Sequence, residues 1–322
     1  MLRRGVLQGE RCAVLRMHAR VSNWSPGAKA EVSQSSKNAV DAGKIRQSLE
    51  VAAQKGGALV FGVADANAFS AAGVGHRPSD LLPNAKSVIV VGGAKPRAGD
   101  WQSPNYQHME LSSTNDRITA LCMRLANHIE REIGYYALVV PPGVDEGQQP
   151  FMSLGLAAEL AGCGTRSLAG PILHSEHGFM YFGALLTTLA LPCDEPLETP
   201  ACPAPACVSM WEDEGKTPCI AACDIEEDGC LGGALTDEGR WENRRYDRGR
   251  CMSRVYNYWG PAFQKVLSET LEEPDKERRR MMINSTLFTR SLWSMTYSNI
   301  SQGQCFECIR VCPIDKQSRV LK

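Results

Sequence analysis

As far as residue 191, apolar residues recur at helical spacing in some segments of this chain and form short continuous runs in others. Spacing of about 3.6 residues predicts helices over residues 39–55, 117–133 and 151–161. Runs rich in β-branched residues predict strands over residues 58–64, 87–92, 135–140, 171–174 and 182–191. Because helices and strands alternate irregularly, we expect an α/β or α+β core that ends near Leu191.

The composition changes after this core. Prolines recur from Pro192 to Pro205, which predicts a stiff linker, and the residues that follow are rich in cysteine. Within them, residues 267–284 form a charged helical stretch that we expect to face solvent. We therefore divide the chain into a leader (1–38), a core (39–192) and a cysteine domain (193–322).

The leader is rich in arginine, and two alternatives account for it. Arg3 and Arg4 resemble the start of a twin-arginine export signal, but the apolar stretch that export requires does not follow them. The alternative to an export signal is a leader that is disordered, or a chain that truly begins at Met17. We expect the disordered leader.

Composition narrows the classes of function. The chain has 322 residues, of which 43% are hydrophobic and 22% charged, as in an ordinary soluble enzyme. Its net charge of −1 gives no reason to expect nucleic-acid binding from bulk charge, although a tRNA partner stays open. No apolar run is long enough for a membrane-spanning helix. Most of the 13 cysteines cluster toward the end, which favours cofactor ligands in a reducing cytoplasm over a disulfide framework.

The most specific motif stands near the end of the chain, where Cys305, Cys308 and Cys312 form a C-x2-C-x3-C-P run. This spacing is typical of ligands to 4Fe-4S clusters, and in two-cluster ferredoxins the last cysteine ligates the other cluster. Zinc is the alternative, since C-x2-C also suits a tetrahedral ion. No second C-x2-C or H-x3-H pair is present to complete a zinc site.

Cys219 and Cys223 repeat half of this motif, so two ligand sets can be proposed. In the full motif, cysteines would also stand at Lys216 and Asp213, and their absence makes one set incomplete. The ferredoxin pattern predicts a first cluster with the ligands Cys223, Cys251, Cys305 and Cys308. A second cluster is possible, with the ligands Cys219 and Cys312 and two cysteines drawn from Cys202, Cys207 and Cys230.

Several segments, in this order, resemble the corrinoid-dependent iron–sulfur reductases, which include epoxyqueuosine reductases and reductive dehalogenases. They are Leu-Leu-Pro-Asn-Ala-Lys-Ser-Val-Ile-Val at 81–90, the helix at 117–133, Ala-Ala-Glu-Leu-Ala-Gly-Cys-Gly at 157–164, His-Gly at 177–178, the run at 182–192 and the cysteine motifs. The resemblance covers roughly residues 40–315. It implies a flavin-reductase-like (nitroreductase-like) α+β core and a C-terminal ferredoxin-like iron–sulfur domain.

The resemblance also implies cofactors and partners. The core would hold base-off cobalamin, in which the cofactor's own base does not ligate the cobalt. The iron–sulfur domain would pass electrons to the cobalt. An organic small molecule would be the substrate, with reduced ferredoxin or flavodoxin as the electron donor. Glycines would let the backbone approach the corrin, although turn formation also accounts for them. These glycines are Gly162, Gly164, Gly178 and Gly183.

Two departures from the family pattern concern the proton donor. Epoxyqueuosine reductases carry an acidic residue in an Asp-x-x-Pro segment, whereas this chain has Asp145 and Glu146 near Pro150, out of register. His177 stands where relatives often have tyrosine, three residues after His174, and could donate a proton or be structural. Two functions stay open: a corrinoid reductase, and an iron–sulfur electron-transfer or corrinoid-handling protein without its own substrate.

Overall fold

The computed structural model describes residues 41–94, 104–141, 150–202, 217–223, 231, 259–294 and 307–314. The leader and several predicted site residues lie outside these ranges, namely Asp145, Cys207, Cys230, Cys251 and Cys305. The division into core and cysteine domain stays a prediction.

The described part begins with α1 (Ala42–Lys55). Asp41 caps this helix, because its carboxylate accepts the backbone N–H groups of Gly43 at 3.1 Å and Lys44 at 3.3 Å. Gly57, with a φ of +94°, turns the chain after the helix and leads it into β1 (Val60–Asp65). A short 3₁₀ turn (Ala66–Ala68) and α2 (Pro78–Leu81) then connect β1 to β2 (Ser87–Ala94).

A curled antiparallel sheet forms the centre of the fold. Its strand order is β1-β2-β6-β5-β4, and β6 (Gly178–Thr187) is the longest strand. One edge of β6 pairs with β2 along its length, with Val90 opposite Ala184. The other edge pairs with β5 (Ile172–His174) at its start and with β3 (Ala137–Val140) at its end. β4 (Thr165–Arg166) pairs with β5.

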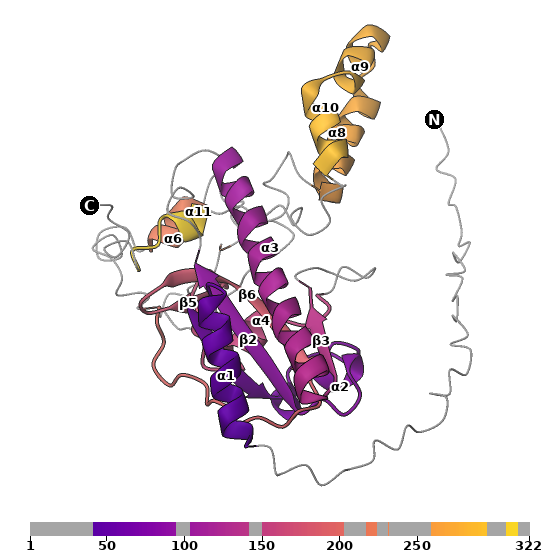
Figure 1. The fold of residues 1–322 in the computed structure, drawn as a ribbon. Coiled ribbons are helices and arrows are strands. Elements are labelled where there is room, and N and C mark those ends of the chain that lie inside the picture. The colour runs from indigo at the N-terminus through magenta and orange to yellow at the C-terminus, as the bar shows by residue number, and fades with distance from the viewer. Residues whose placement is uncertain are drawn as a thin grey trace, which may run out of the picture. The chain divides into compact units, whose positions relative to one another are not determined.

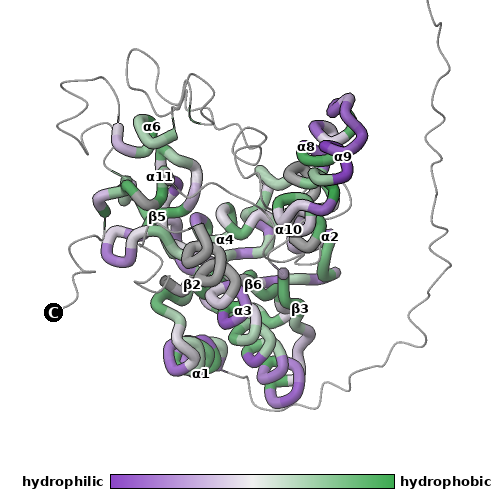
Figure 2. The backbone as a smooth tube through the Cα atoms, turned by 90° about the horizontal axis from the view of Figure 1, so that it is seen from above, coloured by the Kyte–Doolittle hydropathy of each residue, from purple (hydrophilic) through white to green (hydrophobic). Residues whose placement is uncertain are grey.

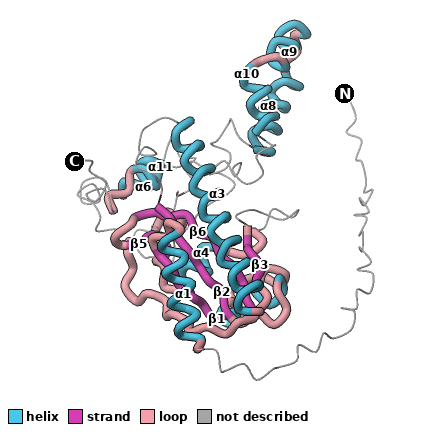
Figure 3. Tube along the Cα trace, viewed as in Figure 1, coloured by secondary structure: helices cyan, strands magenta, loops and turns pink. Residues whose placement is uncertain are grey.

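Helices cover both faces of this sheet (Figures 1 and 3). α1 and α3 (Pro104–His128) pack on one face, where Ile89 and Leu185 meet Leu121 in one buried cluster. α4 (Leu154–Leu160) packs on the other face against alternate strand residues. This alternation follows from the two-residue period of a strand, and it explains why most residues of β2 and β6 are apolar (Figure 2).

α3 passes directly into a π-helical turn at Ile129–Ile133, which ends at Gly134 with a φ of +84°. The antiparallel sheet with helices on both faces confirms the α+β class. The nitroreductase-like core and the ferredoxin-like domain stay predictions. β6 begins at Gly178 rather than at Phe182, because a strand buried on both faces has no polar residue to mark its start.

The later helices differ in one respect from the prediction. The charged stretch at 267–284 is split at Pro274 into α8 (Trp259–Glu272) and α9 (Lys276–Ile283). Asp275 begins α9 by accepting the N–H of Arg278 at 2.8 Å. α10 (Thr286–Ser294) packs on α8, with the rings of Phe263 and Phe288 5.7 Å apart. Most of α9 is strongly hydrophilic and exposed (Figure 2).

Two short helices, α6 (Pro218–Cys223) and α11 (Glu307–Arg310), contact each other although they are far apart in sequence (Figure 1). They carry three of the cysteines that the sequence marked as ligands. None of the helices in the described ranges is long and apolar enough to cross a membrane.

Candidate metal centre

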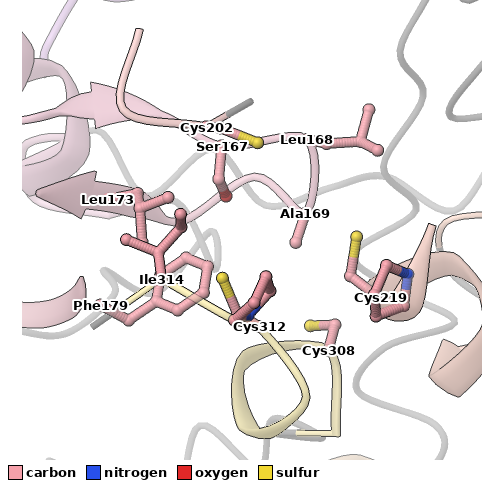
Figure 4. Close-up of a pocket in the computed structure, with 12 residues that line it drawn as sticks. Ser167, Leu168, Ala169, Leu173, Phe179, Cys202, Cys219, Cys308, Cys312 and Ile314 are labelled. Carbon is pink, nitrogen blue, oxygen red and sulfur yellow. The ribbon is translucent and has the colours of Figure 1, made fainter. Parts of the chain in front are cut away.

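Four cysteines from three segments of the chain line one hollow: Cys202, Cys219, Cys308 and Cys312. Cys219 lies on α6 and Cys308 on α11, whereas Cys312 follows α11 and Cys202 follows the core. Figure 4 shows their sulfur atoms around a common space. The hollow has a volume of about 20 Å³, and part of it is open to solvent. The chain thus gathers four thiols, a soft type of metal ligand, from positions as far as 110 residues apart in the sequence.

The core supplies the opposite wall of this hollow. Leu168 and Ala169 come from the loop after β4, and Leu173 and Phe179 come from the hairpin of β5 and β6 (Figure 4). All four are buried. An apolar wall beside the sulfur atoms lowers the local polarity, which is one of the factors that set the potential of an iron–sulfur centre.

Cys202 reaches the hollow because hydrogen bonds hold the preceding segment against the core. The carboxylate of Asp194 accepts the N–H of Val63 at 2.9 Å, and the backbone N–H of Asp194 donates to the carbonyl of Val63 at 2.7 Å. Further along, the N–H of Ala201 donates to Oγ1 of Thr165 at 2.7 Å. The segment from Asp194 to Ala201 is therefore tied at both ends, and Cys202 follows at once.

Thr217 links the start of α6 to one of the sulfur atoms. Its hydroxyl accepts the N–H of Ile220 at 3.4 Å and lies 3.2 Å from Sγ of Cys219. Thr217 is fully buried. Burial raises the pKa of the Cys219 thiol, as does the neighbouring Cys202, while the Thr217 hydroxyl lowers it. When Cys219 ligates as a thiolate, the sulfur can only accept, so the hydroxyl must donate.

Cys223 lies on the same helix but in a buried apolar cluster with Leu168, Ala169 and Leu231. Its sulfur accepts the backbone N–H of Leu231 at 3.4 Å. Cys202, Cys219 and Cys308 pack against this cluster. Cys223 thus stands beside the hollow without lining it.

The arrangement differs from that of a single-ion site. Within the described ranges, no three His, Cys, Asp or Glu side chains stand close enough together to hold one metal ion. Zinc would require thiolates about 2.3 Å from one point. A 4Fe-4S cluster binds each thiolate through a different iron atom, so its ligands stand further apart. The choice between a cluster and a zinc ion therefore stays a prediction from the spacing of the cysteines.

The ligand sets expected from sequence can be compared with this placement. Cys219, Cys312 and Cys202, expected together in a second cluster, line the same hollow. Cys308, expected in the first cluster with Cys223, lines it too. Because the other expected ligands lie outside the described residues, the division into two sets stays a prediction.

His174 and His177 lie at the turn of the β5–β6 hairpin. Their rings stack with centroids 4.7 Å apart and an angle of 17° between the planes. Nδ1 of His174 accepts the N–H groups of Glu176 at 3.1 Å and His177 at 3.3 Å, so it carries no proton. Burial, and secondarily His177, lowers the pKa of His174, whereas Glu176 raises it. Of the two histidines, sequence reasoning favoured His177, but His174 has the more constrained ring.

The four glycines assigned to the corrin by resemblance have other contacts here. A Cβ atom added at Gly183 would lie 2.6 Å from Cγ2 of Ile118 and 2.8 Å from Sγ of Cys122, because α3 crosses the strand there. At Gly162, with a φ of +64°, a Cβ would lie 2.7 Å from the carbonyl oxygen of Glu195. A Cβ added at Gly164 would likewise lie too close to β5, 2.7 Å from Cγ2 of Ile172. Gly178, with a φ of +66°, starts β6.

Close packing or turn geometry thus accounts for these glycines. These contacts do not indicate a corrin. Their assignment to a cofactor stays a prediction, as does that of Asp145, which lies outside the described residues.

No protein-family model matches the chain, and no curated protein is similar to it in sequence. Solved structures do resemble it. One is the epoxyqueuosine reductase of Bacillus subtilis, with 18% identity and a TM-score of 0.46 over 85% of this chain and 66% of that chain. The epoxyqueuosine reductase of Streptococcus thermophilus matches with 18% identity and a TM-score of 0.48, again over 85% of this chain and 66% of that chain.

A reductive dehalogenase, whose structure suggests a mechanism for B12-dependent dehalogenation, matches at 14% identity with a TM-score of 0.45. The match covers 84% of this chain and 38% of the dehalogenase. These oxidoreductases are the ones that the sequence motifs resemble. The chain spans about two thirds of the length of the epoxyqueuosine reductases, and similarity at this level assigns no function.

Proposed function

We propose that this protein is an iron–sulfur oxidoreductase whose cysteine-lined hollow holds a 4Fe-4S cluster. The observation that carries the proposal is the convergence of Cys202, Cys219, Cys308 and Cys312 on one hollow. The donor set supports it as well, because four thiolates are the usual ligands of such a cluster. The C-x2-C-x3-C-P spacing, found in the sequence before any geometry, points to the same cofactor.

The residues of the hollow have separate tasks in this proposal. The cysteines bind, and the Thr217 hydroxyl donates to Sγ of Cys219. Leu168, Leu173 and Phe179 exclude water from one side. A bound cluster supplies one-electron transfer at low potential. The side chains around it set that potential and shield the thiolates from oxidation.

The finer proposal is a cobalamin-dependent reductase that receives electrons from the cluster and reduces an organic substrate. Its support is the order of sequence segments shared with corrinoid reductases. One similar structure is an epoxyqueuosine reductase with a tRNA stem loop. A tRNA substrate is therefore included with small organic molecules, and reduced ferredoxin or flavodoxin is proposed as the donor. His177 or Asp145 would supply the proton to the reduced product.

Anaerobic reconstitution with iron, sulfide and hydroxocobalamin tests both levels of the proposal. We expect about four or eight irons per chain, with sulfur-to-iron charge-transfer absorbance, and one cobalamin retained after gel filtration. Cys202→Ala and Cys219→Ala should each lose a cluster, whereas Cys193→Ala, which changes an exposed thiol away from the hollow, should not. Full iron in Cys202→Ala and Cys219→Ala would disprove the hollow as the cluster site.

The second candidate is an iron–sulfur electron-transfer or corrinoid-handling protein without its own substrate. It is favoured by the first cysteine motif, which has Lys216 and Asp213 where a ferredoxin has cysteines. Retained iron with no retained cobalamin, in the same reconstitution, would select electron transfer over the corrinoid reductase.

A further inference from the structure

A second cavity lies away from the cysteines, between α1 and α3 on one face of the sheet. Its volume is about 150 Å³. Gly56 and Gly57 line it after α1, Leu59 and Gly93 line it from the sheet region, and α3 contributes Thr114, Arg117, Ile118 and Leu121. None of these residues takes part in the cysteine hollow.

Two of the glycines that line this cavity pack closely against α3. A Cβ atom added at Gly56 would lie 2.5 Å from Cδ1 of Leu121, and one at Gly93 would lie 2.6 Å from Cδ1 of Ile118. The backbone therefore approaches the side chains of α3 closely at two points. At Gly57, by contrast, nothing stands within 4 Å of the Cβ position, so the space beside it is empty.

The floor and the rim of the cavity differ in chemistry. Ile118 and Leu121 form an apolar floor and are 6% and 3% exposed. Arg117 and the buried Thr114 add polar groups from the same face of α3. A cavity of this volume holds a group about the size of benzene when its walls are apolar. The floor thus fits a short hydrocarbon body, and the rim fits a polar head.

Arg117 determines which charge the polar head of a ligand should carry in order to bind there. Its Nε donates to the carbonyl of Ser113 and its Nη2 donates to Oγ1 of Thr114, both at 3.3 Å. Among the described residues it has no carboxylate partner, and Nη1 makes no hydrogen bond there. A guanidinium at an apolar cavity favours a carboxylate, which accepts charge-assisted hydrogen bonds.

The end of α1 does not oppose an anion as strongly as a bare helix end would. The carbonyls of Ala52, Ala53 and Gln54 already accept the N–H groups of Gly56, Ala58 and Gly57. Lys55 adds a positive charge to the last turn. Asp116 precedes Arg117 in sequence but does not line the cavity. The groups at the cavity therefore carry net positive charge.

We propose that this cavity binds a small monocarboxylic acid, with its hydrocarbon chain on Ile118 and Leu121 and its carboxylate on Arg117. The site is independent of the cluster and of the proposed reductase activity. It would give the core a ligand-binding function of its own, on the face of the sheet that α1 and α3 cover.

Calorimetric titration of the full-length protein with sodium hexanoate tests the proposal. We expect saturable binding with a dissociation constant on the order of 1–10 mM. Hexanol, which has the same chain without the charge, should bind at least about tenfold more weakly. Amide shifts of Gly57 and Gly93 in labelled protein should change on addition of hexanoate, since both glycines line the cavity.

Arg117→Gln should weaken hexanoate binding about tenfold or more and leave hexanol binding unchanged. Arg124→Gln is the matched control, because it removes an exposed arginine from the same helix outside the cavity. Leu59→Trp, at a residue that is 47% exposed, should fill the entrance and abolish binding of both probes without loss of the fold. Equal hexanoate affinity in Arg117→Gln and the unaltered protein would overturn the proposal, as would equal binding of hexanol and hexanoate.

Discussion

Arg46 and Asp194 form an ion pair across 148 residues of sequence, with Nη2 of the arginine 2.7 Å and 2.8 Å from the two carboxylate oxygens. Arg46 belongs to α1, and Asp194 follows the last strand of the sheet. The same carboxylate accepts the N–H of Val63. One side chain thus joins the first helix, the first strand and the segment that leads to Cys202.

Asp194→Ala should lower the free energy of unfolding by about 1–2 kcal/mol. The estimate allows up to about 1 kcal/mol for an ion pair that is partly exposed to solvent, and about 1 kcal/mol for the hydrogen bond to Val63. Chemical denaturation measures it. Glu195→Ala, which removes the exposed neighbouring carboxylate, should change stability by less than about 0.5 kcal/mol. Similar losses in both variants would show that the contacts of Asp194 contribute nothing specific.

Cys308→Ala should remove an entire cluster rather than weaken it. Cys308 belongs to the C-x2-C pair and lines the hollow, so its loss leaves the site one thiolate short. Iron analysis after anaerobic reconstitution should show about four irons fewer per chain, with a matching loss of charge-transfer absorbance. Cys193→Ala serves as the control. Unchanged iron in Cys308→Ala would show that this cysteine is not a ligand.

Thr217→Val should lower the reduction potential of the cluster without removing it. A hydrogen bond to a ligating sulfur stabilises the reduced, more negative state, so its removal makes reduction harder. Redox titration followed by electron paramagnetic resonance measures the shift. Thr217→Ser should keep the potential, because it keeps the hydroxyl. Thr270→Val makes the same change at a buried threonine whose hydroxyl donates to the carbonyl of Val266, and it should have no effect on potential.

His174 should make stability depend on pH near neutrality. Its pKa is lower in the folded protein than its ordinary value of about 6.5, so the unfolded chain binds more protons just below that value. Stability should therefore fall as pH falls from about 6.5 toward the lower folded pKa, and should be constant with respect to this residue above about 7.5. Denaturation at a series of pH values should show a shallower fall in His174→Gln than in the unaltered protein. An equal slope in both would remove His174 as the cause.

The helices α1, α3 and α4 and most strands followed from the sequence, since Leu121, Leu125 and Ile129 recur on one stripe and Val88 to Val91 form one apolar run. α3 begins at Pro104 rather than at the predicted residue 117, and α2, α6, α10 and α11 were not predicted. The start of β6 did not, because Gly178 to Met180 are buried on both faces and give no alternation. Pro274 marked the end of α8, but the charges around it suggested a continuous helix.

For the candidate site, sequence spacing predicted Cys308 and Cys312 as ligands of a cluster and offered Cys202 only as one of three candidates to join Cys219 and Cys312. That placement depends on the hydrogen bonds of Asp194 and Ala201, which join residues far apart in sequence. The Thr217 hydroxyl was also missed, although a threonine immediately before a short Pro-Cys helix is a recognisable capping position. The cavity at Arg117 had no sequence signal, because the residues that line it come from three segments that are separated in the chain.

The hollow also constrains the order of events during biosynthesis. Cys202 and its apolar wall leave the ribosome long before Cys308 and Cys312, because about 100 residues separate them in the sequence. At about 5–20 residues per second, the core has several seconds to fold before the last two thiols emerge. A cofactor held by all four cysteines cannot be enclosed until Cys312 has been synthesised. Insertion of a cluster would therefore follow synthesis of this residue, and a chain that stalls after the core would leave Cys202 and Cys219 exposed to oxidation.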